Sequence, residues 1–309
     1  MLVFNQIKPD LLNSSCLALG VFDGVHLGHE KVILNAVKKS QNLDALSAVV
    51  TFSKHPRKTP VKLITTLDER LKLFEELGVQ AAIVLDFTEE IHNMTAEDYI
   101  KKFLCEGLNA RSITVGYNHH FGAEKKGNTK LLEKYSSECN YELTVIPPVA
   151  LEGRAVSSSA IRNFISKGDV VSASKFLGRP FSVRGKVIPG QKRGALLGFP
   201  TANLSIPDNI IIPEAGVYSG MVYIQEKSYQ AVINVGKRPT FGDLKENLIE
   251  VHILNFSGDL YNQAIEVSFL KKLREEKKFA STDELKEQII LDCREATFYQ
   301  LNSTSNCNI

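Results

Sequence analysis

Residues Gly20–His29 (GVFDGVHLGH) concentrate glycines and histidines in one short segment. Gly20 and Gly24 allow the backbone to turn tightly and to approach a ligand closely. Gly28 leaves the start of the following helix unobstructed, so that its amides and dipole face an anion. We assign nucleotide or phosphate binding to Gly20, Phe22, Asp23, Gly24 and Gly28.

The two histidines of this segment, His26 and His29, bracket the predicted helix start. Their N–H groups can donate hydrogen bonds to phosphate oxygens. Such donors suit a triphosphate whose leaving pyrophosphate must be stabilised, and we assign both a catalytic role. Two other interpretations stay open, a pair of surface histidines and a zinc site. No third zinc ligand with suitable spacing is found.

A second polar cluster begins a helix near residue 157. Ser157, Ser158 and Ser159 can cap this helix, and Arg162 lies in its first turn. Hydroxyls, amides and a guanidinium together can hold a polyphosphate. A serine run is more often only a helix cap, but the nearby histidine segment favours phosphate binding. We assign binding to the three serines and catalysis to Arg162.

The third candidate is Gly190–Asn203 (GQKRGALLGFPTAN), a glycine-rich loop that leads into a Phe-Pro turn. The side chains of Thr201 and Asn203 suit Mg²⁺ and phosphate, and we expect both to be metal ligands. The Walker A pattern is absent. A tight corner of a β-barrel is the structural alternative. We assign nucleotide binding to Gly198, Pro200 and Thr201.

Buried strands alternate with amphipathic helices in the first half of the chain. This pattern predicts a parallel α/β sheet, whose ligands bind at the carboxyl ends of its strands. A capping box, Thr66 with Glu69, opens one of the helices, which runs to Gly78, and Thr95 caps another that runs through Phe103. The expected strands are 15–20, 45–52, 79–85, 111–116 and 141–146, and the helix after the first spans 28–40.

Strands separated by turn signals dominate after residue 178, which predicts a small antiparallel β-barrel. A second capping box, Ser281 with Glu284, begins a closing helix through about Tyr299. The expected strands are 181–188, 216–225, 228–235, 248–255 and 264–270, with a hairpin at Glu226-Lys227. A Gly/Pro turn near residue 178 divides the chain into expected domains 1–177 and 178–309.

Composition narrows the class of protein. The 309 residues are 43% hydrophobic and carry a formal net charge of only +2, which argues against a nucleic-acid binder. No apolar run is long enough to span a bilayer, and the N-terminus is too polar for a secretory signal. The five cysteines are widely spaced without a CxxC pair. We expect a soluble cytoplasmic protein with reduced thiols and no membrane partner.

The two clusters of the first half resemble the HxGH nucleotidylyltransferase superfamily, and more narrowly the adenylyltransferase module of bacterial bifunctional riboflavin kinase/FAD synthetases. Segments 51–56 (TFSKHP) and 116–122 (GYNHHFG), followed by Gly127-Asn128, are similar to that module. The resemblance implies that FMN attacks the α-phosphorus of ATP, that Asn118 lies near that phosphate, and that Mg²⁺ bridges phosphate oxygens. Lys54, His119 and His120 depart from the family pattern.

The second half resembles the riboflavin kinase module. Similar segments are 197–204 (LGFPTANL), 213–218 (PEAGVY), 233–241 (INVGKRPTF), 250–254 (EVHIL) and 259–261 (DLY). The resemblance implies that Thr201 and Asn203 bind Mg²⁺-ATP and that Glu250 is the general base. From the residues alone, Glu250 is an ordinary exposed strand glutamate. His252 shares its strand face without a matched role, and Ala195 and Asn262 depart from the pattern.

The resemblance therefore implies an enzyme with two ATP-dependent reactions on small molecules, which converts riboflavin to FMN and FMN to FAD. Two other hypotheses are an enzyme with one active site and a flavin-binding regulator without turnover. The retained candidate residues at both sites argue against each. Family members can associate, so a weak homo-oligomer fits the resemblance.

Overall fold

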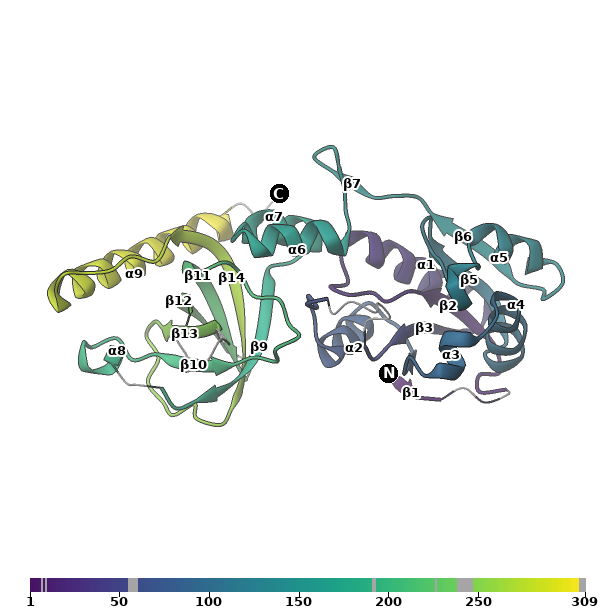
Figure 1. Ribbon diagram of the computed structural model, residues 1–309, viewed down its shortest axis with the longest axis horizontal. Coiled ribbons are helices and arrows are strands. Elements are labelled where there is room, and N and C mark those ends of the chain that lie inside the picture. Colours follow the sequence, from purple (N-terminus) through teal and green to yellow (C-terminus); the bar gives the residue numbers. More distant parts are fainter. Residues whose placement is uncertain are drawn as a thin grey trace. The chain divides into compact units, whose positions relative to one another are not determined.

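The computed structural model describes residues 1–6, 8, 10–54, 61–190, 193–225, 227–237 and 247–305. It divides into two compact units, Met1–Ser158 and Ser159–Ile309 (Figure 1). Several residues of the predicted motifs lie outside the described residues: His55, Pro56, Arg57, Lys58, Gln191, Lys192, Glu226, Arg238, Pro239, Thr240, Phe241 and Cys307.

The first unit contains a six-stranded parallel sheet, as predicted, with the order β1-β4-β3-β2-β5-β6. Its strands are β1 (Leu2–Phe4), β2 (Ser15–Leu19), β3 (Leu46–Phe52), β4 (Ala81–Leu85), β5 (Ala110–Gly116) and β6 (Glu142–Ile146). The chain runs outward from β2 to β3 and β4, then returns to β5 on the other side of β2. This reversal makes the carboxyl ends of β2 and β5 the switch point of the sheet, where α/β proteins bind ligands.

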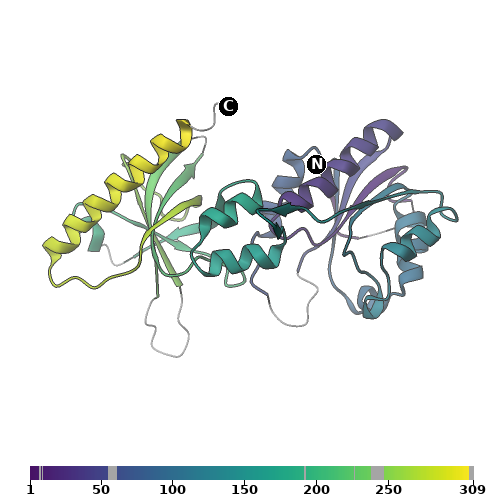
Figure 2. The same ribbon diagram turned by 90° about the horizontal axis from the view of Figure 1, so that it is seen from above.

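Helices cover both faces of this sheet (Figures 1 and 2). The helices are α1 (Leu27–Leu43), α2 (Leu67–Glu76), α3 (Glu89–Asn93), α4 (Ala96–Asp98), η1 (Tyr99–Gly107), η2 (Ala123–Lys125) and α5 (Thr129–Ser136), and a hairpin follows, β7 (Ala150–Leu151) with β8 (Arg154–Ala155). Side chains of β2 point alternately to the two faces of the sheet, and each face carries a hydrophobic core. Ala18 packs with Ile33 and Phe74 of α1 and α2, while Leu17 packs with Phe103 of η1.

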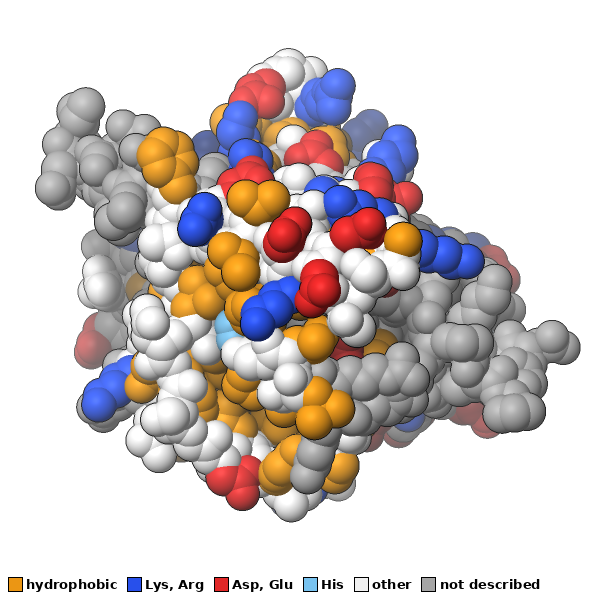
Figure 3. All heavy atoms as spheres, turned by 90° about the vertical axis from the view of Figure 1, so that its left-hand side faces the viewer, with side chains coloured by type: hydrophobic (Ala, Val, Ile, Leu, Met, Phe, Trp, Pro, Cys, Tyr) orange, Lys and Arg blue, Asp and Glu red, His pale blue; other side chains and the backbone are white. Residues whose placement is uncertain are grey.

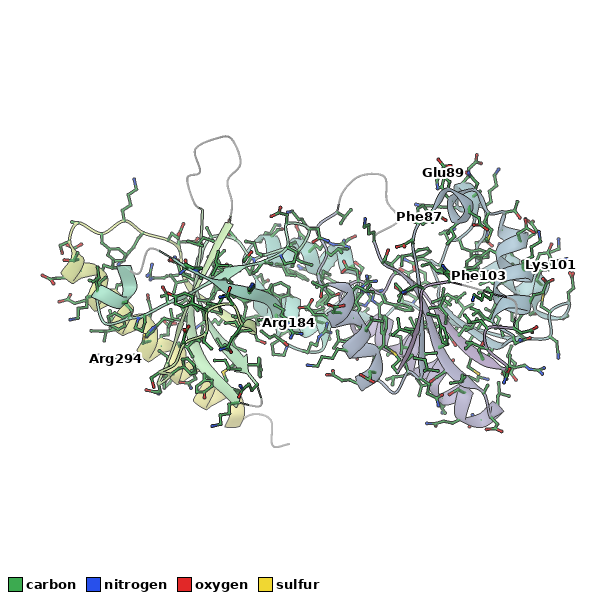
Figure 4. All side chains as sticks on the ribbon, turned by 90° about the horizontal axis from the view of Figure 1, so that it is seen from below. Phe87, Glu89, Lys101, Phe103, Arg184 and Arg294 are labelled. Carbon is green, nitrogen blue, oxygen red and sulfur yellow. The ribbon has the colours of Figure 1, made fainter. Side chains whose placement is uncertain are left out.

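The predicted helix caps at Thr66 and Thr95 are present, but the predicted ends differ. α1 ends at Leu43, three residues past the predicted end, and α2 ends at Glu76, two residues before Gly78. The Thr66–Glu69 capping box is present at α2, and Thr95 accepts a hydrogen bond from the Asp98 amide. The helix predicted to run through Phe103 continues to Gly107 as a π-helix. On this helix Phe103 is buried against the sheet, whereas Lys101 points outward (Figure 4) and pairs with Glu138.

The second unit contains the predicted antiparallel barrel, closed in the order β10-β13-β12-β11-β14-β9. Its strands are β9 (Phe181–Ile188), β10 (Ala202–Ser205), β11 (Gly216–Ile224), β12 (Lys227–Lys237), β13 (Asn247–Ile253) and β14 (Ala264–Arg274). Its helices are α6 (Ser158–Ser166), α7 (Val170–Leu177), α8 (Arg193–Leu196) and α9 (Thr282–Ser305). The predicted hairpin is present, since Ile224 pairs with Lys227. Alternation along β9 leaves Arg184 on the outside (Figure 4).

Four strands were not predicted: β1, β10 and the two short strands of the β7–β8 hairpin. β1 is apolar but only three residues long, which is too short to stand out as a strand in the sequence, and it exposes Leu2 and Val3. β10 begins within the segment 190–203, which was interpreted as a glycine-rich loop and a turn. It closes the barrel by pairing with both β9 and β13.

The closing helix α9 packs on β11, β12 and β14. Ser281 Oγ accepts from the Glu284 amide at 3.2 Å, but Glu284 receives its bond from Ala280, one residue earlier than a capping box requires. The helix extends past the predicted end at Tyr299 to Ser305. Arg274 of β14 holds α9 through a forked hydrogen bond to buried Asp292, at 2.9 and 2.8 Å.

Candidate functional site

The loop after β2 bends sharply enough to require its glycines. Gly24 has φ +84°, and Phe22 also has a positive φ. A Cβ atom at Gly20 would come 2.9 Å from the Phe22 ring. The Phe22 side chain is 1% exposed and packs edge-on against Phe74 and His29. Phe22, which was assigned to nucleotide binding, thus supports the loop from the core through its side chain.

His26 is the N-cap of α1. Its Nδ1 accepts hydrogen bonds from the amides of Gly28 and His29, both at 3.2 Å. Because Nδ1 accepts, the neutral ring carries its proton on Nε2. The amides that were expected to face an anion are therefore taken up by the histidine itself. The ring of His29 stacks on that of His26, with centroids 3.5 Å apart.

Gly28 has a packing role in this arrangement. A Cβ atom there would lie 3.1 Å from His26 Cε1, which is tighter than ordinary contact. The absence of a side chain at position 28 thus lets the His26 ring lie over the start of the helix.

Asp23 is buried and its carboxylate is engaged within the fold. Oδ1 accepts from the amides of Ile64 and Thr65 at 2.9 and 3.2 Å, and Thr65 Oγ1 accepts from the Gly24 amide at 2.9 Å. These bonds tie the glycine-rich loop to the segment before α2. The sequence indicated phosphate binding for Asp23, and this geometry gives its side chain a positioning role.

Arg70, which the sequence interpretation did not single out, lies at the same edge of the sheet. Its guanidinium, 2% exposed, donates to Val21 O at 2.8 Å, Thr51 Oγ1 at 3.1 Å and Phe52 O at 3.0 Å. It thereby joins the carboxyl ends of β2 and β3. Burial lowers the pKa of the Arg70 guanidinium, and the charge of Asp23 opposes that shift. The spacing of four residues to buried Phe74 is the signal that could have placed Arg70 on the inner face of α2.

Asn118 follows β5 at the same sheet edge, since β2 and β5 are parallel neighbours. It is exposed, and its turn is closed by the His119 amide, which donates to Gly116 O at 3.0 Å. The His119 ring stacks on Phe121, with centroids 5.7 Å apart. His119 departs from the family pattern, but its ring makes the stacking contact that an aromatic side chain would make at this position.

Of the three serines 157–159, Ser158 forms a hydrogen bond with the glycine-rich loop after β2. Ser158 Oγ donates to Asp23 O at 2.9 Å, within the first unit. Its hydroxyl proton is used in this bond. Ser157 precedes the helix, while Ser159 and Arg162 belong to the second unit. On α6, Arg162 lies one turn beyond Ser158, on the same helix face. Lys54, which departs from the family pattern, is exposed.

A row of polar residues crosses the outer face of the barrel. Asn203 of β10 lies opposite Glu250 of β13, which in turn lies opposite Asn234 of β12. Directly opposed residues place their side chains on one face of a sheet. Their neighbours Ile249 and Val251 are buried inside the barrel. This register brings Asn203 and Glu250 together, and it adds Asn234, which was not singled out from the sequence.

Asn203 presents an unmet acceptor in this row. It is 4% exposed, and among the described residues its Oδ1 has no hydrogen-bond partner. Glu250 is partly exposed, and Thr201, two residues before Asn203, is exposed. The described residues contain no group of three or more His, Cys, Asp or Glu side chains placed to hold a metal. A cation here would therefore need oxygen ligands of the amide and hydroxyl kind, together with those of a substrate.

The loop before Thr201 is compact. The Phe199 amide donates to Gly194 O at 2.8 Å, and a Cβ atom at Gly194 would come 2.4 Å from Phe199 O. Gly198 has φ +90°, a conformation that favours glycine. Asn262, where the family more often has glycine, has φ +66° and is one of the residues that tolerate this region.

Two family models match the chain. A FAD synthetase model matches residues 8–160, and a riboflavin kinase model matches residues 177–299. No helix among the residues that the structure describes is long and apolar enough to cross a membrane.

Curated relatives match nearly the whole chain. The Bacillus subtilis bifunctional riboflavin kinase/FMN adenylyltransferase is 35% identical over 93% of both chains. The Escherichia coli K12 protein of the same name is 34% identical, over 89% of this chain and 90% of its own. Among solved structures, a Streptococcus pneumoniae protein described as a macrolide-efflux protein has a TM-score of 0.87 at 31% identity. That match covers 96% of this chain and 99% of the other.

Proposed function

Because the chain belongs to the bifunctional riboflavin kinase/FMN adenylyltransferase family, we propose that two separate sets of residues carry its two reactions. The enzyme phosphorylates riboflavin with ATP to give FMN, and it transfers an adenylyl group from a second ATP to FMN to give FAD and pyrophosphate. We assign adenylyl transfer to residues 1–177 and the kinase to residues 178–309. The family-model boundaries at 160 and 177 support this division.

For adenylyl transfer, an FMN phosphate oxygen attacks the α-phosphorus of ATP, and the bond to pyrophosphate breaks in line. No covalent enzyme intermediate is needed, so catalysis comes from positioning and charge neutralisation. His26 donates from Nε2, with His29 stacked beside it and Arg162 supplying positive charge. The observation that carries this assignment is the cap: His26 Nδ1 accepts two amides, which aims a fixed Nε2–H donor away from the helix.

For the kinase, Glu250 accepts the proton of the ribityl 5′-hydroxyl, whose oxygen then attacks the γ-phosphorus of ATP as ADP leaves. Thr201 and Asn203 would hold Mg²⁺, and the unmet Oδ1 of Asn203 suits this role. When bound, Mg²⁺ neutralises phosphate charge. Support for Glu250 comes from its register between Asn203 and Asn234.

We further propose that both reactions take place in the cytosol. Four cysteines of the described residues, Cys16, Cys105, Cys139 and Cys293, are free thiols, as a reducing compartment requires. The substrates are small molecules, and neither reaction needs a nucleic acid or membrane partner.

The test is a time course with riboflavin, ATP and Mg²⁺, with the flavins separated by chromatography. The matched variant is His26→Asn, whose side-chain oxygen can still cap α1 but which lacks the Nε2 donor. We expect wild-type FMN formation and FAD formation slower by about 100-fold, as for the loss of one fixed donor. Wild-type FAD formation by His26→Asn would remove His26 from the assignment.

A further inference from the structure

His252 contacts two consecutive residues of the loop that precedes Thr201. Its Nδ1 lies 2.8 Å from Pro200 O, and its ring meets the Phe199 ring edge-on at 5.5 Å between centroids. His252 is the only histidine in residues 159–309. On the face that Figure 3 presents, hydrophobic side chains gather between charged ones.

The Pro200 contact fixes the chemistry of the ring. A carbonyl oxygen only accepts, so His252 Nδ1 must carry a proton and donate it. Proline has no amide hydrogen, so this carbonyl is the backbone hydrogen-bonding group that residue 200 has to offer. The bond therefore attaches the Phe199-Pro200 turn to a side chain of the barrel wall.

That side chain comes from the strand that carries the proposed base. His252 lies two residues after Glu250 on β13, and residues two apart share a face of a strand. β13 is paired on both sides, with Glu250 fixed against Asn203 and Asn234. One rigid strand thus holds both Glu250 and the turn that leads to Thr201.

Among the residues of this loop that the structure describes, few other anchors lie on this side. Its short helix α8 exposes Leu196 by 87%, and its backbone bonds, such as Phe199 N to Gly194 O, run within the loop. Bonds of that kind shape the turn without fixing where it stands relative to β13. The His252 contacts set that relation.

We propose that His252 is a positioning residue of the kinase, which holds the Phe199-Pro200 turn so that Thr201 meets the phosphates of ATP in register with Glu250. This inference rests on the proposed function of Thr201 and Glu250. His252 takes no part in proton transfer in this account, since its Nδ1 proton is committed to Pro200 O.

Three substitutions separate the contacts. His252→Asn places an amide donor near the position of Nδ1, His252→Gln places it near that of Nε2, and His252→Phe keeps an aromatic edge for Phe199 without a donor. We expect the KM for ATP to rise about tenfold in His252→Phe and His252→Gln, with a smaller change in kcat, as for one lost hydrogen bond. His252→Asn should stay within about threefold of wild type.

Each protein also carries its own control, because FAD formation from FMN should be unchanged in all three variants. Equal behaviour of the Asn, Gln and Phe variants would overturn the proposal, as would losses that follow a lowered melting temperature. Thr201→Ala distinguishes a failure of the proposed function of Thr201 from a failure of the positioning role of His252. If it leaves the KM for ATP unchanged, the assignment of Thr201 fails. If it raises KM while His252→Phe does not, the positioning role alone fails.

Discussion

Gly190 lies directly against the side-chain amide of Asn203. A Cβ atom at position 190 would come 2.1 Å from Asn203 Nδ2 and 2.8 Å from Oδ1. Real Cβ atoms do not approach that closely, so any side chain at 190 must displace the amide. Gly190, which begins the loop before α8, therefore leaves the room that the side-chain amide of Asn203, a proposed Mg²⁺ ligand, occupies.

The first prediction is that Gly190→Ala selectively impairs the kinase. The added methyl group should turn Asn203 away from the outer face of β10, and we expect FMN formation to fall at least tenfold, on the order of one lost ligand contact. Initial rates of FMN formation from riboflavin measure this, and FAD formation from FMN on the same protein is the control. A wild-type kinase rate would show that the amide need not stay where it lies.

The second prediction concerns Arg70. Replacing it by Met leaves the acceptors Val21 O and Phe52 O without their buried donor, which we expect to destabilise the first unit by roughly 2–4 kcal/mol. FAD formation should fall because Val21 lies in the glycine-rich loop, while the kinase should be unaffected. Calorimetry and the two rate assays measure these effects. Arg70→Lys keeps the charge but not the fork, and full function in that variant would contradict the account.

The fold was largely predictable because its signals are local. Alternating apolar runs and the Thr66 cap indicated the sheet and its helices, and the glycines with His26 indicated the switch-point loop. Long-range partners left weaker signals. Nothing near Asp23 in the sequence shows that its carboxylate binds the amides of Ile64 and Thr65, and β10 becomes a strand only because β9 and β13 flank it.

The residue spacing at the start of α1 predicted the position of the helix but not the hydrogen bonds of His26. The spacing of His26 and Gly28 correctly marked a helix N-terminus, but a histidine near such a terminus can donate to a ligand or accept from the amides. The rotation of the His26 ring decides between these, and it depends on stacking against His29, whose ring in turn meets Phe22 edge-on. The partner of His252 could not be predicted from local spacing either, because Pro200 lies 52 residues away in the sequence.

The third prediction is a pH dependence that originates at His119. Burial lowers the pKa of His119 from 6.5 to about 4, and the charge of His120 adds to this shift. His119 is therefore protonated below about pH 6.5 in the unfolded chain, but only below about pH 4 in the folded chain. Stability should be lost as the pH falls through this window, by roughly 1–3 kcal/mol in total.

The control for this effect is His119→Phe, which keeps a ring to stack on Phe121 but does not titrate. Thermal unfolding of both proteins at pH 7 and pH 5 measures the difference. We expect the wild type to lose more stability than the variant on acidification. An identical loss in the two proteins would show that other groups cause it.

The fourth prediction concerns how α9 is held on the barrel. Asp292 is 3% exposed and receives the forked bond of Arg274 together with a bond from Gln288. Asp292→Asn cannot accept the fork at both oxygens, so we expect the second unit to lose roughly 2–3 kcal/mol of stability. Hydrogen exchange of β12 and β14 amides should quicken in the variant. Unchanged exchange there would mean that apolar packing alone holds α9.

The most direct test of the central claim, two reactions carried by separate residues, is the product pattern of Glu250→Gln. The substitution preserves size and register between Asn203 and Asn234 but removes the base. With riboflavin and ATP we expect FMN formation to fall by about 100-fold or more. With FMN and ATP the same protein should make FAD at the wild-type rate. Substantial FMN formation from riboflavin, or a matching loss of FAD formation from FMN, would contradict the assignment of Glu250 and the independence of the two sites.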